Sequence, residues 1–233
     1  MNPLAEPQTP PHTAAPAGPR FQHFSTRAFA TELPWSAAFV RHFQAAKWAT
    51  NGKAGVSWRG IRMLKDPFTL SLYASLLWEL RPRTIFEMGA FEGGSALWFA
   101  DMAAAMGLDA SVVSFDKDLS AIQARHPRVS FLRLDAEAVE SEWDESLQTR
   151  HAHPFLVIED AHVNLVAVLH RLADLLDVGD YLVVEDTCDA AKYREFARFM
   201  EARQDSLFVD SHYTDNFGYN ASWNWNSFLR RMS

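Results

Sequence analysis

Hydrophobic and polar residues follow two different periods along the chain after Asp66. Short apolar runs are typical of strands buried on both faces, whereas apolar residues that recur every three or four positions are typical of amphipathic helices. The short runs predict strands at 84–89, 111–116, 129–135, 155–160, 181–186, 206–210 and 221–232. The longer pattern predicts helices at 67–81, 94–106, 119–126, 164–176 and 190–202, with a polar, irregular stretch before residue 154. Strands that alternate with helices indicate an α/β fold with a mostly parallel sheet and helices on both faces.

The region before this alternation has a different composition. Residues 1–20 hold more than half of the chain's 11 prolines and predict a disordered tail. A separate helix is predicted at 34–50, where Ser36 is a candidate N-cap and aromatic residues follow at near-helical spacing. We therefore divide the chain into a Pro-rich tail at 1–20, a helical extension at 21–65 and the main domain at 66–233. A lid or an oligomer contact is one expected role for the extension, and packing alone is the favoured interpretation of its helix.

The overall charge excludes some classes of partner. The chain has 29 acidic against 22 basic residues, a net charge of −7, which argues against a nucleic-acid groove. One cysteine rules out an intrachain disulfide and fits a reducing compartment. We find neither an apolar run long enough to cross a bilayer nor a signal peptide, and we expect a cytoplasmic protein without membrane contacts.

The segment IFEMGAFEGGSALWFA joins a predicted strand to a predicted helix through a glycine-rich turn. Glycines permit a sharp bend and a close ligand, and a helix N-terminus offers free amides to an anion. The spacing is not the G-x-G-x-x-G of dinucleotide folds. It reads E-x-G-x-x-x-G-G, which is similar to the first motif of class I S-adenosylmethionine (SAM) methyltransferases. The cofactor-binding residues predicted here are Glu87, Gly89, Gly93, Gly94 and Ser95, although a loop that only lets helix pack on strand is the alternative.

Acidic residues also end the next two predicted strands. Asp116 is placed to accept hydrogen bonds from both hydroxyls of a ribose, and Asp135 to meet an adenine amino group. A surface acid at a strand end explains Asp135 equally well when it is taken alone. The ordered set of glycine turn, ribose acid and adenine acid predicts a nucleoside site, because ligands of open α/β sheets bind at the carboxyl ends of strands.

Two later strands, FLVIED and YLVVED, each end in a pair of carboxylates. If these strands are neighbours about 4.8 Å apart, their carboxylates crowd each other unless a proton or a cation intervenes. Oxygen ligands favour a hard ion such as Mg²⁺. We predict Asp160, Glu185 and Asp186 as the metal ligands, with a bend bringing the last two together, while Glu159 faces away. The alternative is that these acids cap helices in solvent.

His162 lies just beyond Asp160 and is the candidate general base for a metal-bound hydroxyl. A structural role for a lone histidine in a loop is the alternative. Aromatic residues crowd the C-terminal region, where Tyr213, Phe217 and Tyr219 are candidates for an acceptor pocket. For Trp223 and Trp225, packing is the favoured interpretation.

The chain resembles the cephalosporin hydroxylase-like family in four segments: SWRGIRMLKDPFTLSLYASLLWELRPRTIFEMGAFEGGSALWFADMA, FDKD, VIEDAH and YLVVEDT. That family includes rhamnosyl O-methyltransferases, the cephamycin methoxylation methyltransferase and macrolide-sugar O-methyltransferases. The likeness covers about Trp58 to Thr187, and the acidic pattern is its most specific part.

The resemblance implies a Rossmann-like class I methyltransferase fold with a seven-stranded sheet and an antiparallel C-terminal strand. It also implies SAM and Mg²⁺ as cofactors, with an aspartate after the fourth strand and an acidic pair after the fifth as metal ligands. Those positions are again Asp160, Glu185 and Asp186. One departure concerns His162, because the macrolide-sugar enzymes place their histidine one residue further from the metal aspartate.

These observations favour a Mg²⁺-dependent SAM O-methyltransferase, with catalysis assigned to Asp160 and His162. The acceptor is expected to be a hydroxyl of a small natural product, and a homo-oligomer is expected from the resemblance. A non-catalytic SAM-binding scaffold is the alternative, although a scaffold has no need of crowded carboxylates. A nicotinamide-dependent oxidoreductase is disfavoured by the glycine spacing.

Overall fold

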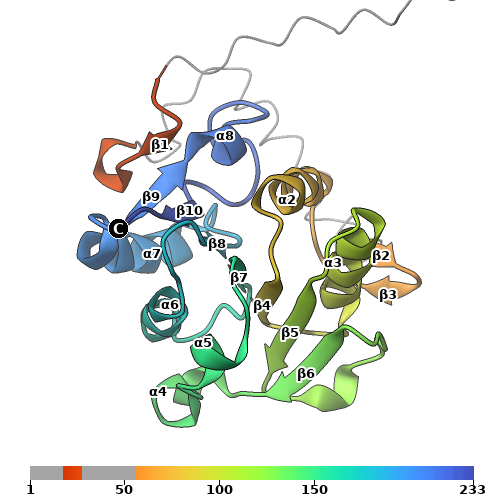
Figure 1. Cartoon of the computed structure of the whole chain (residues 1–233). Helices are drawn as coiled ribbons and strands as arrows, with labels where there is room; N and C mark the ends of the chain where they lie inside the picture. Colours follow the sequence, from red (N-terminus) through yellow and green to blue (C-terminus); the bar gives the residue numbers. More distant parts are fainter. Residues whose placement is uncertain (1–17, 28–55) are drawn as a thin grey trace, which may run out of the picture.

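An eight-stranded sheet with helices on both faces forms the framework of the protein (Figure 1). The computed structural model describes residues 18–27 and 56–233. The strand order is β1-β9-β10-β8-β7-β4-β5-β6, and the strands from β8 to β6 are parallel. β10 is antiparallel to both of its neighbours, and β1 is antiparallel to β9.

The strands of the sheet are β1 (Phe21–Gln22), β4 (Thr84–Met88), β5 (Ser111–Asp116), β6 (Val129–Arg133), β7 (Phe155–Glu159), β8 (Tyr181–Val184), β9 (Leu207–Asp210) and β10 (Phe228–Arg231). A separate hairpin consists of β2 (Ser57–Trp58) and β3 (Ile61–Arg62). The α-helices are α2 (Pro67–Leu80), α3 (Gly94–Ala105), α4 (Val139–Glu142), α5 (Leu147–Arg150), α6 (Leu165–Asp174), α7 (Ala190–Arg203) and α8 (Ser211–Thr214). Short 3₁₀ turns occur at η1 (Phe24–Thr26), η5 (Leu119–Ala121) and η6 (Ala136–Ala138).

The side chains of the sheet alternate between two apolar layers. Strand residues such as Ile85 and Leu156 pack with α2 and α3 on one face. Their neighbours Phe86 and Val157 pack with α6 and α7 on the other face. Because both faces are covered, the parallel strands are apolar almost throughout, which explains why their sequences read as continuous runs.

The order of the strands fixes where a ligand site belongs. β4 lies at the centre of the parallel strands; the chain continues to β5 and β6 on one side of it and then returns to β7 and β8 on the other. The crevice outside the carboxyl ends of β4 and β7 is therefore the switch point at which open α/β sheets bind ligands. In Figure 1 the arrowheads of β4 and β5 point toward this edge, on the side where α4 lies.

The predicted fold class is confirmed, with one more strand than expected because β1 pairs with β9 at the sheet edge. The predicted start of α2 is also confirmed, since the Asp66 carboxylate accepts hydrogen bonds from the amides of Phe68 and Thr69 at 2.9 and 3.1 Å. The predicted helix at 34–50 lies outside the described residues. Among the described residues, no helix is both long and apolar enough to cross a membrane.

Two predicted elements are wrong in extent. Only the turn η5 forms where a helix at 119–126 was expected, and Ile122 is already extended. Pro127 contributes to this result, because a proline disfavours helical geometry at the residue before it. The predicted strand at 221–232 is reduced to β10, since Asn220 and Asn226 adopt positive φ angles of 50° and 53° that turn the chain.

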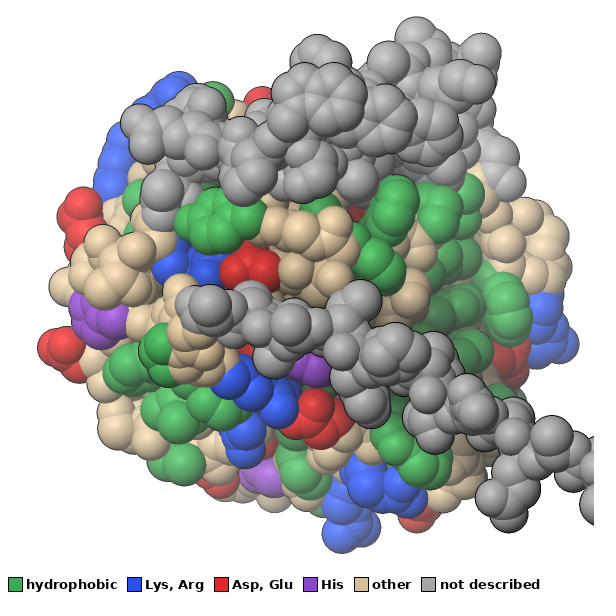
Figure 2. Space-filling view, turned by 90° about the horizontal axis from the view of Figure 1, so that it is seen from above, with side chains coloured by type: hydrophobic (Ala, Val, Ile, Leu, Met, Phe, Trp, Pro, Cys, Tyr) green, Lys and Arg blue, Asp and Glu red, His purple; other side chains and the backbone are tan. Residues whose placement is uncertain are grey.

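Charged side chains of both signs are mixed on the face seen from above (Figure 2). Within the described part of that face, Lys and Arg are interspersed with Asp and Glu and do not gather into one basic patch. This distribution agrees with the net charge of −7.

Candidate active site

A cavity of about 290 Å³ opens at the carboxyl ends of β4, β5 and β7. Its wall contains apolar side chains, including Met63, Phe115 and Leu134, together with several acids. The sequence-predicted site residues in its lining are Gly89, Ser95, Asp116, Asp135, Asp160, His162 and Asp186. The structure thus brings most of the predicted site together at the switch point, while Glu87, Gly93, Gly94 and Glu185 do not belong to the lining.

Gly89 brings the ends of β4 and β7 close together. Its φ angle is +99°, and a Cβ at this position would lie 2.6 Å from the backbone oxygen of Asp160. Only glycine combines this backbone geometry with so close an approach. The residue thereby links the glycine turn directly to the strand end that carries the first predicted metal ligand.

Gly93 and Gly94 serve the packing of the turn. A Cβ on Gly93 would lie 2.8 Å from Ala124 and from the ring of Phe131, and one on Gly94 would lie 2.2 Å from the backbone oxygen of Arg62. Gly93 therefore allows Ala124 and the β6 residue Phe131 to pack against the start of α3, and Gly94 allows the β2–β3 hairpin to do so. For these two positions the structure supports the packing interpretation.

Glu87 is a fully buried acid behind the glycine turn. Its Oε2 accepts a hydrogen bond of 2.6 Å from the hydroxyl of Ser114. Burial raises the pKa of Glu87 above its ordinary value, and the positive charge of Lys65 opposes this shift. Glu87 consequently lies behind the cavity lining, where Ser114 holds it in place.

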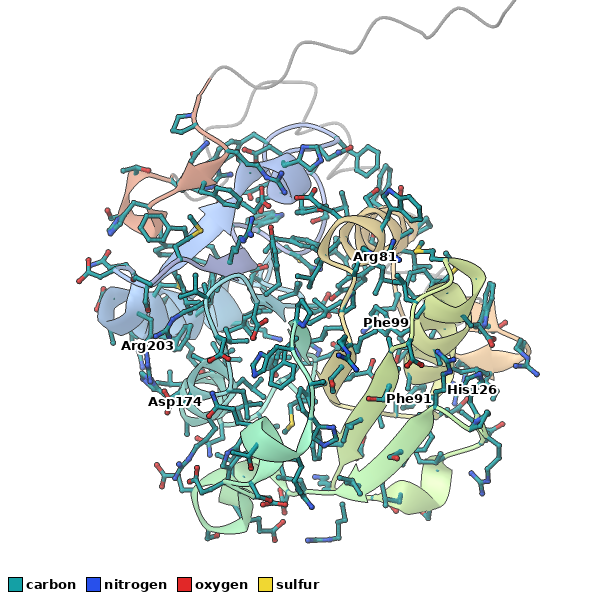
Figure 3. The ribbon with its side chains drawn as sticks, in the orientation of Figure 1. Arg81, Phe91, Phe99, His126, Asp174 and Arg203 are labelled. Carbon is teal, nitrogen blue, oxygen red and sulfur yellow. The ribbon has the colours of Figure 1, made fainter. Side chains whose placement is uncertain are left out.

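Asp116 and Asp135 are held at the cavity by short local hydrogen bonds. Asp116 accepts the amides of Phe91 and Asp118 at 3.0 and 3.2 Å, which fixes its carboxylate between two loops. Asp135 accepts the amide of Glu137 at 3.1 Å and starts η6. Figure 3 labels Phe91, whose partly exposed ring lies in the loop that follows β4.

Lys65 lies between the two acidic strand ends. Its ammonium is 2.5 Å from Asp160 Oδ2 and 2.9 Å from Glu185 Oε1, and its side chain is only 1% exposed. The sequence predicted that a proton or a cation must separate these carboxylates. In the structure the chain itself provides that cation.

The charges in this group shift one another's pKa values. Burial favours the neutral form of Asp160, but Lys65 and His162 outweigh it and hold the pKa of Asp160 well below its usual range. For Glu185, burial and the negative charge of Asp160 prevail over Lys65 and raise the pKa to about 8. Asp160 is thus the ionised member of the pair, and Glu185 is the member that holds a proton most readily.

Tyr73 fixes Glu185 from the side of α2. Its hydroxyl donates a 2.6 Å hydrogen bond to Glu185 Oε1. The ring of Tyr73 is fully buried and packs edge-on against Phe99 of α3, with ring centroids 5.0 Å apart. Phe99 is labelled in Figure 3 in the layer between α2 and α3. Oε1 of Glu185 is therefore anchored in the interior, behind the residues that line the cavity.

The turn after β8 directs Asp186 into the cavity. Asp186 has a φ angle of +55°, and its amide donates a 3.0 Å hydrogen bond to the side-chain oxygen of Asn224. Thr187 donates to the backbone oxygen of Trp225 at 2.9 Å, and the Cys188 amide donates to that of Trp223 at 2.9 Å. The bend that the sequence required at this strand end is present, and the C-terminal loop fastens it.

The aromatic residues of the C-terminal region lie outside the lining of the cavity. Tyr213 and Trp225 are buried, and none of the five aromatic residues predicted or considered for an acceptor pocket lines the cavity. Packing is the interpretation that the structure supports for Trp225.

His162 completes the acidic side of the cavity. It adopts a positive φ angle of 60°, and its Nε2 lies 3.0 Å from Asp160 Oδ1 and 3.5 Å from Asp186 Oδ2. Ligand atoms of Asp160, His162 and Asp186 all lie within 4.8 Å of one another. The oxygen donors present suit a hard divalent cation, because carboxylates are the side chains that bind Mg²⁺.

Three residues of this network were not found by reading the sequence: Lys65, Tyr73 and Lys192. Lys192, on α7, contacts both His162 and Glu159, which is fully buried and also accepts the amides of Ala161 and His162. Lys65 and Tyr73 lie far from the acids in sequence and match no short motif. Their only signal was an apolar segment, MLKDPFTLSLY, that contains a lysine with no evident surface role.

An open α/β sheet of this order, with a glycine turn and acids at successive strand ends around one cavity, defines the class I SAM-dependent methyltransferase fold. A structure of CmcI with Mg and SAM is similar over 92% of this chain and 91% of its own, at 32% identity and a TM-score of 0.66. A structure of CmcI without ligands gives a TM-score of 0.67 at the same identity and coverage.

The family can be named more closely. The sequence model described as rhamnosyl O-methyltransferase/CmcI matches residues 51–205, and the chain belongs to this family. A rhamnosyl O-methyltransferase of Mycobacterium leprae (strain TN) is 33% identical over 139 residues, which are 56% of this chain and 60% of that protein. One of Mycobacterium tuberculosis (strain ATCC 25618 / H37Rv) is 29% identical over 138 residues, 56% of each chain. The chain therefore spans a little more than half the length of the curated relatives it matches.

Proposed function

We propose that this protein is a SAM-dependent O-methyltransferase that uses Mg²⁺ and methylates a hydroxyl of a small natural-product molecule. The observation that carries the proposal is a cavity whose acids come from strand ends on both sides of β4. Asp116 and Asp135 line one side, and Asp160 and Asp186 line the other. A nucleoside-type cofactor and a cation-bound acceptor would meet between them.

The cofactor side supports SAM. Asp116 is positioned to accept the ribose hydroxyls, Asp135 lies at the next strand end, and the Gly89 turn lets a ligand approach the backbone. Ser95, near the N-terminus of α3, also lines the cavity, where free helix amides favour a carboxylate. Similarity to CmcI with Mg and SAM supports the same cofactor.

The acidic side supports a metal. We propose Asp160, Glu185 and Asp186 as its carboxylate ligands. Lys65 and Tyr73 both contact Oε1 of Glu185, so Oε2 is the oxygen we assign to the cation. A bound Mg²⁺ would lower the pKa of an acceptor hydroxyl and hold its oxygen in place.

The residues around the cation complete the chemistry. Asp160 is kept ionised by Lys65 and His162, as a metal ligand must be. His162 lies at the two cavity carboxylates, and we propose it as the group that takes the proton of the acceptor. The acceptor oxygen would then attack the SAM methyl group in line as the bond to sulfur breaks and S-adenosylhomocysteine leaves, and the cavity would contribute mainly by positioning the two reactants.

The acceptor is proposed to be a hydroxylated small molecule such as a sugar. Rhamnosyl O-methyltransferases among the relatives support a deoxysugar hydroxyl as the first candidate. A diol or a hydroxylated scaffold fits the same chemistry, because a metal can chelate two neighbouring oxygens. We also propose that the protein forms a homo-oligomer.

The proposal is tested by titrating SAM into the purified protein by calorimetry, with Mg²⁺ and again with EDTA, followed by transfer assays. We expect SAM to bind in both buffers. We expect methyl transfer to methyl rhamnoside, or to a catechol as a second probe, only in Mg²⁺. SAM binding without transfer to any alcohol would indicate a non-catalytic SAM-binding protein, and no SAM binding would contradict the whole proposal.

A further inference from the structure

Lys192 forms a bridge behind the imidazole of His162. Its ammonium lies 2.7 Å from His162 Nδ1 and 2.8 Å from Glu159 Oε2. The side chain of Lys192 is 9% exposed, and that of Glu159 is fully buried. This arrangement places a cation against the imidazole nitrogen that faces away from the cavity.

The contact determines which imidazole nitrogen carries the hydrogen. A lysine ammonium has three N–H donors and no lone pair, and its ion pair with buried Glu159 stabilises the charged form. Lys192 can therefore only donate to Nδ1, which must offer its lone pair. A neutral imidazole has one N–H group, so the hydrogen of His162 lies on Nε2.

The opposite side of the ring leads to the same assignment. Nε2 faces Asp160 Oδ1 at 3.0 Å and Asp186 Oδ2 at 3.5 Å. Ionised carboxylates only accept hydrogen bonds, so both are satisfied by an N–H at Nε2. A ring turned by half a revolution would place carbons against these partners and lose the contacts on both sides.

We propose that Lys192 is a positioning residue that keeps His162 in the Nε2–H form and so excludes it from metal coordination. A histidine binds a metal through a nitrogen lone pair, and its other nitrogen normally donates its N–H to an acceptor. Here the other nitrogen meets a donor. The cation site is thereby restricted to oxygen ligands, which favours Mg²⁺ over the ions that prefer imidazole.

The inference has a clear consequence for metal choice. Without Lys192, the side chains of Asp160, Asp186 and His162 would form a two-carboxylate, one-histidine set of the kind that suits transition metals. The inference rests on the proposed metal site at Asp160 and Asp186, but it concerns only which atoms bind the ion. In the Nε2–H form His162 offers no lone pair to the cavity. The proposed base role of His162 therefore requires the contact with Lys192 to open and the ring hydrogen to move to Nδ1.

The first experiment examines the wild-type protein and uses one variant only for assignment. In protein labelled with ¹⁵N-histidine, long-range proton–nitrogen correlations report which ring nitrogen is protonated, and the His162→Asn variant assigns the signals. At mildly alkaline pH, where a free imidazole is neutral, we expect the Nε2–H form in the wild type, both without metal and after addition of Zn²⁺. An Nδ1–H form, or coordination of Zn²⁺ by His162 in the wild type, would overturn the inference.

The second experiment measures the affinities for Zn²⁺ and Mg²⁺ by calorimetry. Lys192→Met should raise the ratio of Zn²⁺ to Mg²⁺ affinity by ~10-fold or more, which is the size of effect typical for groups behind a metal ligand. Because the ratio is compared, a general electrostatic gain for both ions cancels. Lys192→Arg, which keeps a charged donor, should leave the ratio unchanged.

A double variant separates coordination from charge. In Lys192→Met with His162→Asn, the gain in Zn²⁺ preference should disappear, because no imidazole remains to bind the ion. An unchanged ratio in Lys192→Met would overturn the inference. If Lys192→Met bound Zn²⁺ through His162 while the wild type bound no cation, the inference would stand and the proposed role of Mg²⁺ would fall.

Discussion

The two sides of the cavity are held in place by different kinds of contact. We call Gly89, Asp116 and Asp135 the nucleoside side, and Asp160, Glu185 and Asp186 the acidic side. On the nucleoside side, the carboxylates accept amides from nearby loops, and two of these contacts span only two residues. This side is therefore built by the turns that follow its own strands.

The acidic side depends on distant parts of the chain. Lys65 lies 95 residues from Asp160, and Tyr73 lies 112 residues from Glu185. Asn224, which holds the Asp186 amide, comes from the loop before the last strand. The nucleoside side is thus held by contacts that are local in sequence, and the acidic side by contacts that form only when distant segments pack together. Removing the contacts of one side should therefore disrupt that side and leave the other in place.

The largest expected effect separates the two sides by function. Asp160→Ala should lower turnover by ~10³-fold or more and leave SAM affinity nearly unchanged, because it removes a group that acts on the acceptor side. Asp116→Ala should instead raise the Kd for SAM ~10–100-fold, the value expected for charged hydrogen bonds. Calorimetry and initial rates measure both, with the exposed Asp205→Ala as control. Equal loss of SAM affinity in the two variants would remove the distinction.

Removal of the internal cation should show that the acidic side depends on tertiary contacts. Lys65→Met is expected to lower the free energy of unfolding by ~3–5 kcal/mol, because it leaves buried carboxylates without their partner. Urea unfolding in EDTA measures this change. The double variant with Glu185→Gln should recover part of the loss, since the amide needs no counter-ion. A loss below ~1 kcal/mol would show that the carboxylates do not need Lys65.

Gly89 is the position where the two sides meet, and its substitution should damage both. Gly89→Ala adds a Cβ at 2.6 Å from the Asp160 backbone to a residue with positive φ. Gly107→Ala is the matched control, because Gly107 has φ +67° and nothing within 4 Å of its Cβ. We expect ~1 kcal/mol of destabilisation for the control and at least twice as much for Gly89→Ala. Equal losses in thermal or urea unfolding would mean that the strand ends adjust freely.

The last prediction, which is small for each pH unit, is a dependence of stability on pH. Because the pKa of Glu185 rises from its ordinary value of 4.5 to about 8, the folded protein keeps a proton there that the unfolded chain releases. Stability in EDTA should therefore fall as pH rises between these values, by up to ~1.4 kcal/mol per pH unit. Glu185→Gln should flatten this slope in urea unfolding. A wild-type slope equal to that of the variant would assign the pH dependence to other groups.

The nucleoside side was the more predictable part of the structure. Asp116 and Asp135 were located correctly because each ends a strand, and strand ends of a parallel sheet meet at one edge. Gly89 followed from the same reasoning, whereas Gly93 and Gly94 were assigned to the cofactor on spacing alone, and an added Cβ at either position would meet neighbouring protein atoms. Sequence spacing indicates a sharp turn, but it does not say on which side of the turn a glycine faces.

For the acidic side, the sequence predicted that the carboxylates crowd each other but did not indicate that Lys65 lies between them. The crowding of Asp160 and Glu185 followed from neighbouring strands, and a compensating cation was expected. That Lys65 provides one could not be predicted, since contacts between residues far apart in sequence are set by the packing of α2 on the sheet. The helix expected at 119–126 failed for a different, local reason, because a periodic pattern was given more weight than Pro127.

The hydrogen bonds from the C-terminal loop to the turn after β8 lead to a practical rule for redesign. The family match ends at residue 205, yet Trp223, Asn224 and Trp225 hold the turn that carries Asp186. A chimera that exchanged only the matched segment with a relative would combine the acidic turn of one protein with the C-terminal loop of the other. The hydrogen bonds that hold the turn would then no longer be matched to it. Engineers who seek a new acceptor specificity should therefore transplant residues 185–188 and 215–227 as one unit, and sequences of relatives should vary at these two segments in concert.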